Sequence, residues 1–282
     1  TLFPHIKTIA QDIAISPMIR VYTMNRLLGR QLFIYEESQK KDKIETLLLE
    51  YINSENELMR LGAISYIYLN GVSNNLLSKE KTAELLMIAL EKENYKDIKL
   101  NILRGLYHLS SNELFEPLMK YAEKESDNQV LSSIAEVLQK SLNQQIRDKL
   151  LEKDETGKYT YLEHPSPSVR QVAIKLVALG ETEGTVNALL ETFENEKNPE
   201  IIALILSTFN AFNIKTYRSR IDKLEKRLLT EDEDGKYVYI EHDNEYVILN
   251  AARIIEMNML FKAVKALEKQ LQKEKNKDFK KQ

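Results

Sequence analysis

The sequence predicts an all-helical protein built as a stack of about seven helical hairpins. Three observations lead to this prediction. Gly and Pro are scarce, with 8 and 6 copies in 282 residues, whereas folds rich in strands need many turns. Leu, Ile, Ala, Glu and Lys, which are mostly good helix formers, dominate the composition. One segment also occurs twice, at a distance that fits two helical hairpins.

The internal repeat is clearest in two octapeptides. Gly157–His164 reads GKYTYLEH and Gly235–His242 reads GKYVYIEH, so six of the eight positions are identical at an offset of 78 residues. This offset contains two units of about 39 residues, which is within the range of helical-hairpin repeats.

Each expected hairpin contains an aliphatic residue in its first helix, and a basic residue often follows it. These anchors are Ile19-Arg20, Met59-Arg60, Ile98-Lys99, Val130, Val169-Arg170, Ile201 and Val247. They predict hairpins over residues 5–53, 54–92, 93–125, 126–164, 165–196, 197–242 and 243–275. One hairpin cannot bury both of its faces, so stacked hairpins form one continuous core. We therefore expect a single domain over 1–275 and a polar, Lys-rich tail over 276–282.

Helical periodicity and start signals support these boundaries. Five aliphatic residues follow the i, i+3, i+4, i+7, i+8 pattern of a buried helix face, and four more form a stripe in the last helix. Asn198 is expected to cap a helix that has Pro199 at its first position. The two stripes are Val169, Val172, Ala173, Leu176 and Val177, then Leu260, Val264, Leu267 and Leu271.

The segment from His164 to Gly180, HPSPSVRQVAIKLVALG, resembles the first helix of a HEAT repeat. It is most similar to the short HEAT-like repeats common in bacteria and in phycobilin lyases. Thr185–Phe193 resembles the second helix of such a unit. The resemblance implies a right-handed α-α superhelix of the HEAT and armadillo kind, with a surface that binds other macromolecules. It does not imply one particular activity.

The amino-acid composition excludes several kinds of functional site. The chain has no cysteine, which excludes disulfides, thiolate zinc sites and cysteine nucleophiles. A net charge of −3 gives no general attraction to nucleic acid. The longest apolar run, Ile201–Leu206, is far shorter than the ~18 residues of a membrane span. We find no Walker loop, GxGxxG, HExxH or GxSxG pattern, so we expect neither catalysis nor a cofactor.

The paired loops are the first candidate binding site. The turn-forming clusters DETG at 154–157 and EDG at 233–235 lead into stretches that we expect to be extended, with two tyrosines on one face of each. Exposed tyrosines make good anchors for a partner protein. Alternatively, these segments fold back and cover the groove between repeats. The candidate residues are Tyr159, Tyr161, His164, Tyr237, Tyr239 and His242.

The Glu-His dipeptides that end the two loops suggest a metal site as an alternative. Carboxylate and imidazole are both metal ligands, and the HEAT-repeat deoxyhypusine hydroxylases bind iron through His-Glu dipeptides. Here the order is reversed, in Glu163-His164 and Glu241-His242, and only two copies occur. We therefore expect these residues to cap or precede helices and assign no metal ligands.

Two basic segments could contact other partners. Arg20, Arg26 and Arg30 would form the contact surface of a nucleic-acid binder, but the chain lacks tryptophan and is not basic overall. We expect these arginines to be solvated or paired with neighbouring repeats. The Lys-rich stretch 262–282 could dock on an acidic partner or lipid head groups. A polar capping helix is the simpler interpretation.

Taken together, the residues favour a non-catalytic scaffold or adaptor that binds another protein and is a monomer or weak oligomer. Nucleic-acid binding and a metal-dependent enzyme using the Glu-His pairs are the alternatives. The compartment stays open between the cytoplasm and, if an N-terminal signal was removed, the periplasm.

Overall fold

The described part of the chain is helical. The computed structural model describes residues 41–67, 77–180, 182–212, 218–258 and 263–268, with the single residues Thr8, Tyr22, Thr23, Arg26, Leu260 and Gln272. These residues form helices and two isolated β-bridges but no strand, which confirms the all-α prediction. None of their helices is long and apolar enough to cross a membrane. The chain divides into two compact units, Thr1–Leu142 and Asn143–Gln282.

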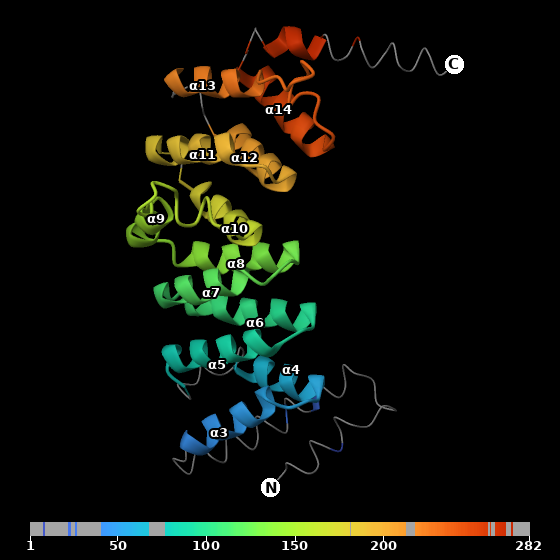
Figure 1. Ribbon diagram of the computed structural model, residues 1–282. Coiled ribbons are helices and arrows are strands. Elements are labelled where there is room, and N and C mark those ends of the chain that lie inside the picture. The colour runs from blue at the N-terminus through green and yellow to red at the C-terminus, as the bar shows by residue number, and fades with distance from the viewer. Residues whose placement is uncertain are drawn as a thin grey trace, which may run out of the picture. The chain divides into compact units, whose positions relative to one another are not determined.

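The first unit consists of helices that pack on near neighbours in the sequence. α4 packs on α3, α5 and α6, and α6 packs in turn on α5 and α8, while α7 packs on α8. In Figure 1, α3, α5 and α7 lie on one side of this unit and α4, α6 and α8 on the other. Its elements are α3 (Lys41–Ile52), α4 (Glu57–Tyr66), α5 (Lys79–Lys92), α6 (Lys96–Leu109), a 3-10 turn (Asn112–Leu114), α7 (Phe115–Ala122) and α8 (Asn128–Lys140).

The second unit repeats this arrangement. α12 packs between α10 and α14, α11 packs on α13, and the two rows meet where α11 contacts α12 and α13 contacts α14. Its helices are α9 (Gln144–Leu150), α10 (Pro167–Val177), α11 (Glu183–Asn195), α12 (Pro199–Ala211), α13 (Arg218–Leu228) and α14 (Glu245–Asn258).

The predicted hairpins can be compared with these helices between residues 54 and 242. Each predicted hairpin from residue 54 to residue 242 contains two of the helices. The predicted stripe on α10, from Val169 to Val177, is buried throughout. The stripe near the C-terminus differs from the prediction. Leu260 is buried, but Ala263 and Ala266 face the core in place of Val264 and Leu267, which are half-buried. Leu271 lies outside the described residues.

Six helices begin with the same local device. The first backbone N–H groups of a helix lack partners within the helix. At α4, α6, α8, α10, α12 and α14, the side chain two residues before the N-cap accepts the backbone N–H of the N-cap residue. The acceptors are Ser54, Glu93, Glu125, His164, Glu196 and His242, at 2.8–3.1 Å from the nitrogens of Asn56, Tyr95, Asp127, Ser166, Asn198 and Asn244. The predicted cap at Asn198 is confirmed.

Candidate binding surface

Three ion pairs connect successive repeats. In each pair, a basic residue four positions after one N-cap binds the glutamate that accepts at the next N-cap. Arg170 Nε and Nη2 donate to the two oxygens of Glu196 at 2.7 and 2.9 Å, while Nη1 donates to the carbonyl oxygen of His164 at 2.7 Å. Arg60 binds Glu93 in the same two-pronged way, and Lys99 Nζ lies 2.8 Å from Glu125 Oε2. We call these contacts the inter-repeat bridges.

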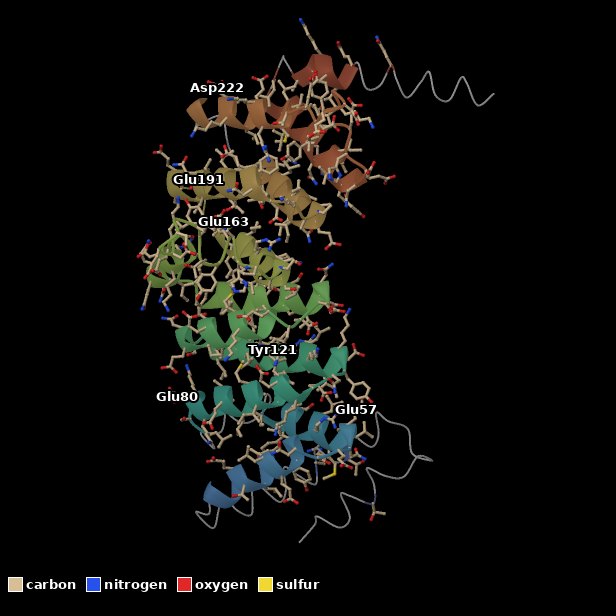
Figure 2. The ribbon with its side chains drawn as sticks, viewed as in Figure 1. Glu57, Glu80, Tyr121, Glu163, Glu191 and Asp222 are labelled. Atoms are coloured by element: carbon tan, nitrogen blue, oxygen red, sulfur yellow. The ribbon has the colours of Figure 1, made fainter. Side chains whose placement is uncertain are left out.

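Two of the bridges lower the pKa of their carboxylates, Glu93 and Glu125. Burial raises the pKa of Glu93, but hydrogen bonds from Arg60 and from the backbone N–H groups of Tyr95 and Asn94 outweigh it, so the pKa is lowered. The same balance lowers the pKa of Glu125, where the main opposing partner is Lys99. Tyr121, which Figure 2 labels, donates its hydroxyl to Glu125 at 3.3 Å. Burial and that carboxylate raise the pKa of the Tyr121 phenol.

Histidine replaces glutamate where the basic residue is missing. The bridge position carries Leu131 in the repeat before His164 and Ile202 in the repeat before His242. Each histidine accepts the N-cap N–H through Nδ1, at 3.1 and 2.9 Å. An Nδ1 atom that accepts a hydrogen bond carries no proton. The neutral ring therefore keeps the helix cap without needing a cation from the preceding repeat.

The two repeated loops have nearly the same backbone hydrogen bonds. Asp154 N donates to Lys158 O at 2.8 Å, Thr160 N to Glu152 O at 3.0 Å and Glu163 N to Tyr159 O at 3.1 Å. The three equivalent bonds, 78 residues later, measure 2.9 Å each. The loop around Gly157 and the loop around Gly235 are thus the same structure, built twice. We call residues 154–158 and 232–236 the loop tips.

An aspartate and a glycine determine the backbone conformation of each loop tip. Asp154 Oδ1 accepts from the backbone of Thr156 and Lys158, and Asp232 Oδ1 accepts from the equivalent pair. The Thr156 hydroxyl and the Lys158 N–H lower the pKa of Asp154. Gly157 and Gly235 have φ angles of 82° and 72°, a region that other residues occupy only with strain. The tips are exposed and are held by their own bonds.

The segments after the tips are not extended as expected. Tyr159 forms one β-bridge residue with Lys153, and the chain then turns at once, because Glu163 N bonds back to Tyr159 O. The paired tyrosines therefore do not share a face. Tyr159 and Tyr239 are buried, with 7% and 2% of their surface exposed, while Tyr161 and Tyr237 are half-buried. Burial raises the pKa of both buried phenols, and it favours the structural-cover interpretation for these two side chains.

Both loops rest on α11. The ring of Tyr239 lies 4.8 Å from that of Phe193, and Arg227 lies 5.4 Å over the Tyr239 ring while donating to Glu194 O. On the first loop, Lys153 pairs with Glu191 at 2.6 Å and lies 4.5 Å over the Tyr159 ring. The two loops thus contact α11 through different residues of that helix.

A cleft lies between the first loop and α11. Its volume is about 640 Å³, and Gly157, Glu163 and His164 line it on the loop side. Figure 2 shows Glu163 below Glu191, which lines the cleft from α11. Glu163 uses one oxygen to accept from Tyr159 N at 2.9 Å and the other to accept from Asn195 at 3.2 Å. The sequence-predicted residues Glu163 and His164 therefore belong to a defined recess.

The remaining candidates are only partly placed. Arg26 donates to the Tyr22 hydroxyl at 3.1 Å, whereas Arg20 and Arg30 lie outside the described residues. Across the part of the chain that is described, no three His, Asp or Glu side chains are arranged to hold a metal ion. The backbone bonds to His164 and His242 agree with the helix-capping interpretation.

Two features escaped the sequence analysis. The basic half of each bridge was visible as the residue after the aliphatic anchor, but its glutamate lies 26 or 33 residues further on. The recurrence of glutamate two residues before a cap could have revealed it. The second feature is an exposed apolar row on α14, which the buried stripe of the same helix conceals in the sequence.

Comparisons with protein-family models and with curated proteins give no match to this chain.

Proposed function

We propose that the chain is a HEAT-like α-solenoid of about seven hairpins in a right-handed superhelix, and that it acts as a non-catalytic adaptor for another protein. The repeated helix starts and the inter-repeat bridges support the repeat architecture. Three repeats are each tied to the next by a contact between equivalent positions, as expected for a solenoid. The resemblance of His164–Gly180 to a HEAT repeat points the same way.

The observation that carries the binding role is the loop that occurs twice. A connection between helices needs only a few residues, yet both loops add a hydrogen-bonded tip that lies exposed beside half-buried Tyr161 or Tyr237. Rigid, exposed loops on a helical scaffold bind partners at a low cost in conformational entropy. The cleft next to the first tip offers a recess for a partner side chain. We assign the partner-binding surface to the two loops and this cleft.

The test is a quantitative pull-down with two matched baits. The loop variant carries Lys158→Ala, Tyr161→Ala, Lys236→Ala and Tyr237→Ala, which remove exposed or half-buried side chains. The control carries Tyr159→Phe and Tyr239→Phe, which keep the buried rings. Circular dichroism must show that both variants fold. We expect a protein that the wild type and the control capture and the loop variant does not.

Two results would overturn the proposal. Equal recovery of every captured protein by the loop variant would remove the loops from the binding surface. Capture of nucleic acid with steep salt dependence would favour the nucleic-acid alternative instead. For a protein partner recognised by shape and aromatic contacts, binding should survive moderate salt.

A further inference from the structure

One surface row on α14 differs in character from the equivalent rows on α8 and α12. Tyr246, Leu249 and Met257 are 72%, 48% and 53% exposed, and Arg253 lies between them on the same face. These four residues follow one another at intervals of three or four, so they form a single line along the helix. We call this line the α14 row.

The repeats themselves provide the comparison. Counted from the N-cap, the same four positions are also largely exposed on α8 and α12. There they carry polar or small residues, so the position does not demand an apolar side chain. Tyr246, Leu249 and Met257 therefore need a separate explanation. The equivalent residues are Gln129, Ser132, Glu136 and Lys140 on α8, and Glu200, Ala203, Ser207 and Ala211 on α12.

The row is not the face that packs within the unit. α14 buries Val247, Ala251, Ile254 and Ile255 against its neighbours, and this set lies on another side of the helix. Large apolar side chains in an exposed line mark interaction sites. A line of i, i+3, i+7 and i+11 positions matches the spacing by which an amphipathic helix docks.

The charges around the α14 row favour one kind of partner helix. Around the row, Asp243, Glu245 and Glu256 are exposed, and Arg253 is the one basic residue between 243 and 258. A partner with lysine or arginine beside its apolar stripe would meet these carboxylates, whereas an acidic helix would be repelled. The row begins just after the second repeated loop, whose His242 binds the backbone N–H of Asn244, the residue that caps α14.

We propose that the α14 row docks a basic amphipathic helix of a partner protein. This proposal rests on the adaptor function and names a second surface for it, with the chemical class of its ligand. The row spans 12 residues from Tyr246 to Met257, so a partner helix of about three turns, or about 17 Å, would cover it.

The probe is a fluorescent peptide of about 18 residues, or five helical turns. It has leucine at helical spacing on one face and lysine elsewhere. Its counterpart has glutamate in place of every lysine. Fluorescence anisotropy with the full chain should show binding of the lysine peptide and at least about tenfold weaker binding of the glutamate peptide.

Three variants locate the site. Replacing Tyr246, Leu249 and Met257 by serine should weaken binding of the lysine peptide at least about tenfold, because apolar anchors dominate such interfaces. The matched control places serine at Glu200, Ala203 and Ala211 of the α12 row and should bind like the wild type. The third variant, Glu245→Lys with Glu256→Lys, keeps the apolar row but should lose the preference for the lysine peptide. This third variant tests the docking proposal even if the serine variant does not fold.

The peptide-binding results also distinguish the α14 row from the loop surface. The loop variant described above should still bind the lysine peptide. Equal binding of this peptide by the wild type and a folded α14-row variant would overturn the proposal, as would a wild-type preference for the glutamate peptide. Sedimentation equilibrium covers the remaining occupant: a wild-type dimer that the serine substitutions abolish would show that a second copy of the chain fills the row.

Discussion

At the residue scale, the two loops show how equivalent side chains acquire different roles. Tyr161 and Tyr239 occupy equivalent positions, but Tyr161 is half-buried while Tyr239 packs on Phe193 beneath Arg227. Identity of sequence therefore does not determine burial. The neighbours that a ring meets, here the aromatic ring of α11 and the guanidinium of α13, determine it.

This difference predicts unequal costs of truncation. Tyr239→Ala removes a buried ring, so the free energy of unfolding should fall by about 3–5 kcal/mol. Tyr161→Ala, its equivalent on the first loop, should cost no more than about 1.5 kcal/mol, since part of that side chain already contacts water. Urea unfolding followed by circular dichroism measures both. Equal losses would mean that both loops cover the core in the same way.

The carboxylates of the bridges predict how stability depends on pH. The pKa values of Glu93 and Glu125 are lowered in the folded protein. The stability that they contribute is complete above the unfolded pKa of about 4.3 and is lost as the pH falls through the lower folded values. Between about pH 5 and pH 3, the free energy of unfolding should therefore fall more steeply in the wild type than in a Glu93→Gln, Glu125→Gln variant. Parallel curves for the two proteins would contradict this expectation.

At the element scale, the helix starts follow a substitution rule. A repeat with arginine or lysine at the bridge position is followed by a glutamate at the next cap, whereas one with leucine or isoleucine is followed by histidine. Electrostatics explains the rule, because a buried carboxylate without a cation is costly and a neutral imidazole is not. Both residue types still accept the N-cap N–H.

The rule can be tested by converting one kind of repeat start into the other. Arg170→Leu leaves Glu196, whose side chain is 5% exposed, without its cation and should cost about 2–4 kcal/mol. Adding Glu196→His should restore more than about half of that loss, because the new pair matches Leu131 and His164. The single Glu196→His variant completes the double-mutant cycle. Strict additivity of the two changes would disprove the coupling.

The all-helical class and the start of α12 at Asn198 could be predicted from the sequence, since periodicity and capping signals are local. The tyrosine arrangement could not, because the Glu163–Tyr159 bond that turns the chain after the first tip gives no local pattern. The bridges and the α14 row could not be predicted for a different reason. Their partners, or their exposure, depend on residues a whole repeat away.

At the scale of the whole molecule, contacts join residues that lie near one another in the sequence. The bridges join residues 26–33 positions apart, and each helix packs on its near successors within its own unit. In such a molecule a perturbation should remain near its origin, because the stability of a repeat depends mainly on its neighbours.

Hydrogen exchange measured by mass spectrometry tests this locality. Arg170→Leu should accelerate exchange in α10, α11 and α12 of the second unit and leave α4, α5 and α6 of the first unit unchanged. Arg60→Leu should give the opposite pattern. Uniform acceleration over the whole chain by either substitution would show that the protein opens only as one cooperative block.

The bridges also have a consequence for how the protein emerges during synthesis. Arg170 is made before Glu196, so its repeat remains without the bridge until 26 more residues have been added, which takes a few seconds at about 5–20 residues per second. A nascent chain would thus gain stability stepwise, one repeat at a time. The two repeat starts that use histidine have leucine or isoleucine at the bridge position, so these two starts do not wait for such a bridge to form.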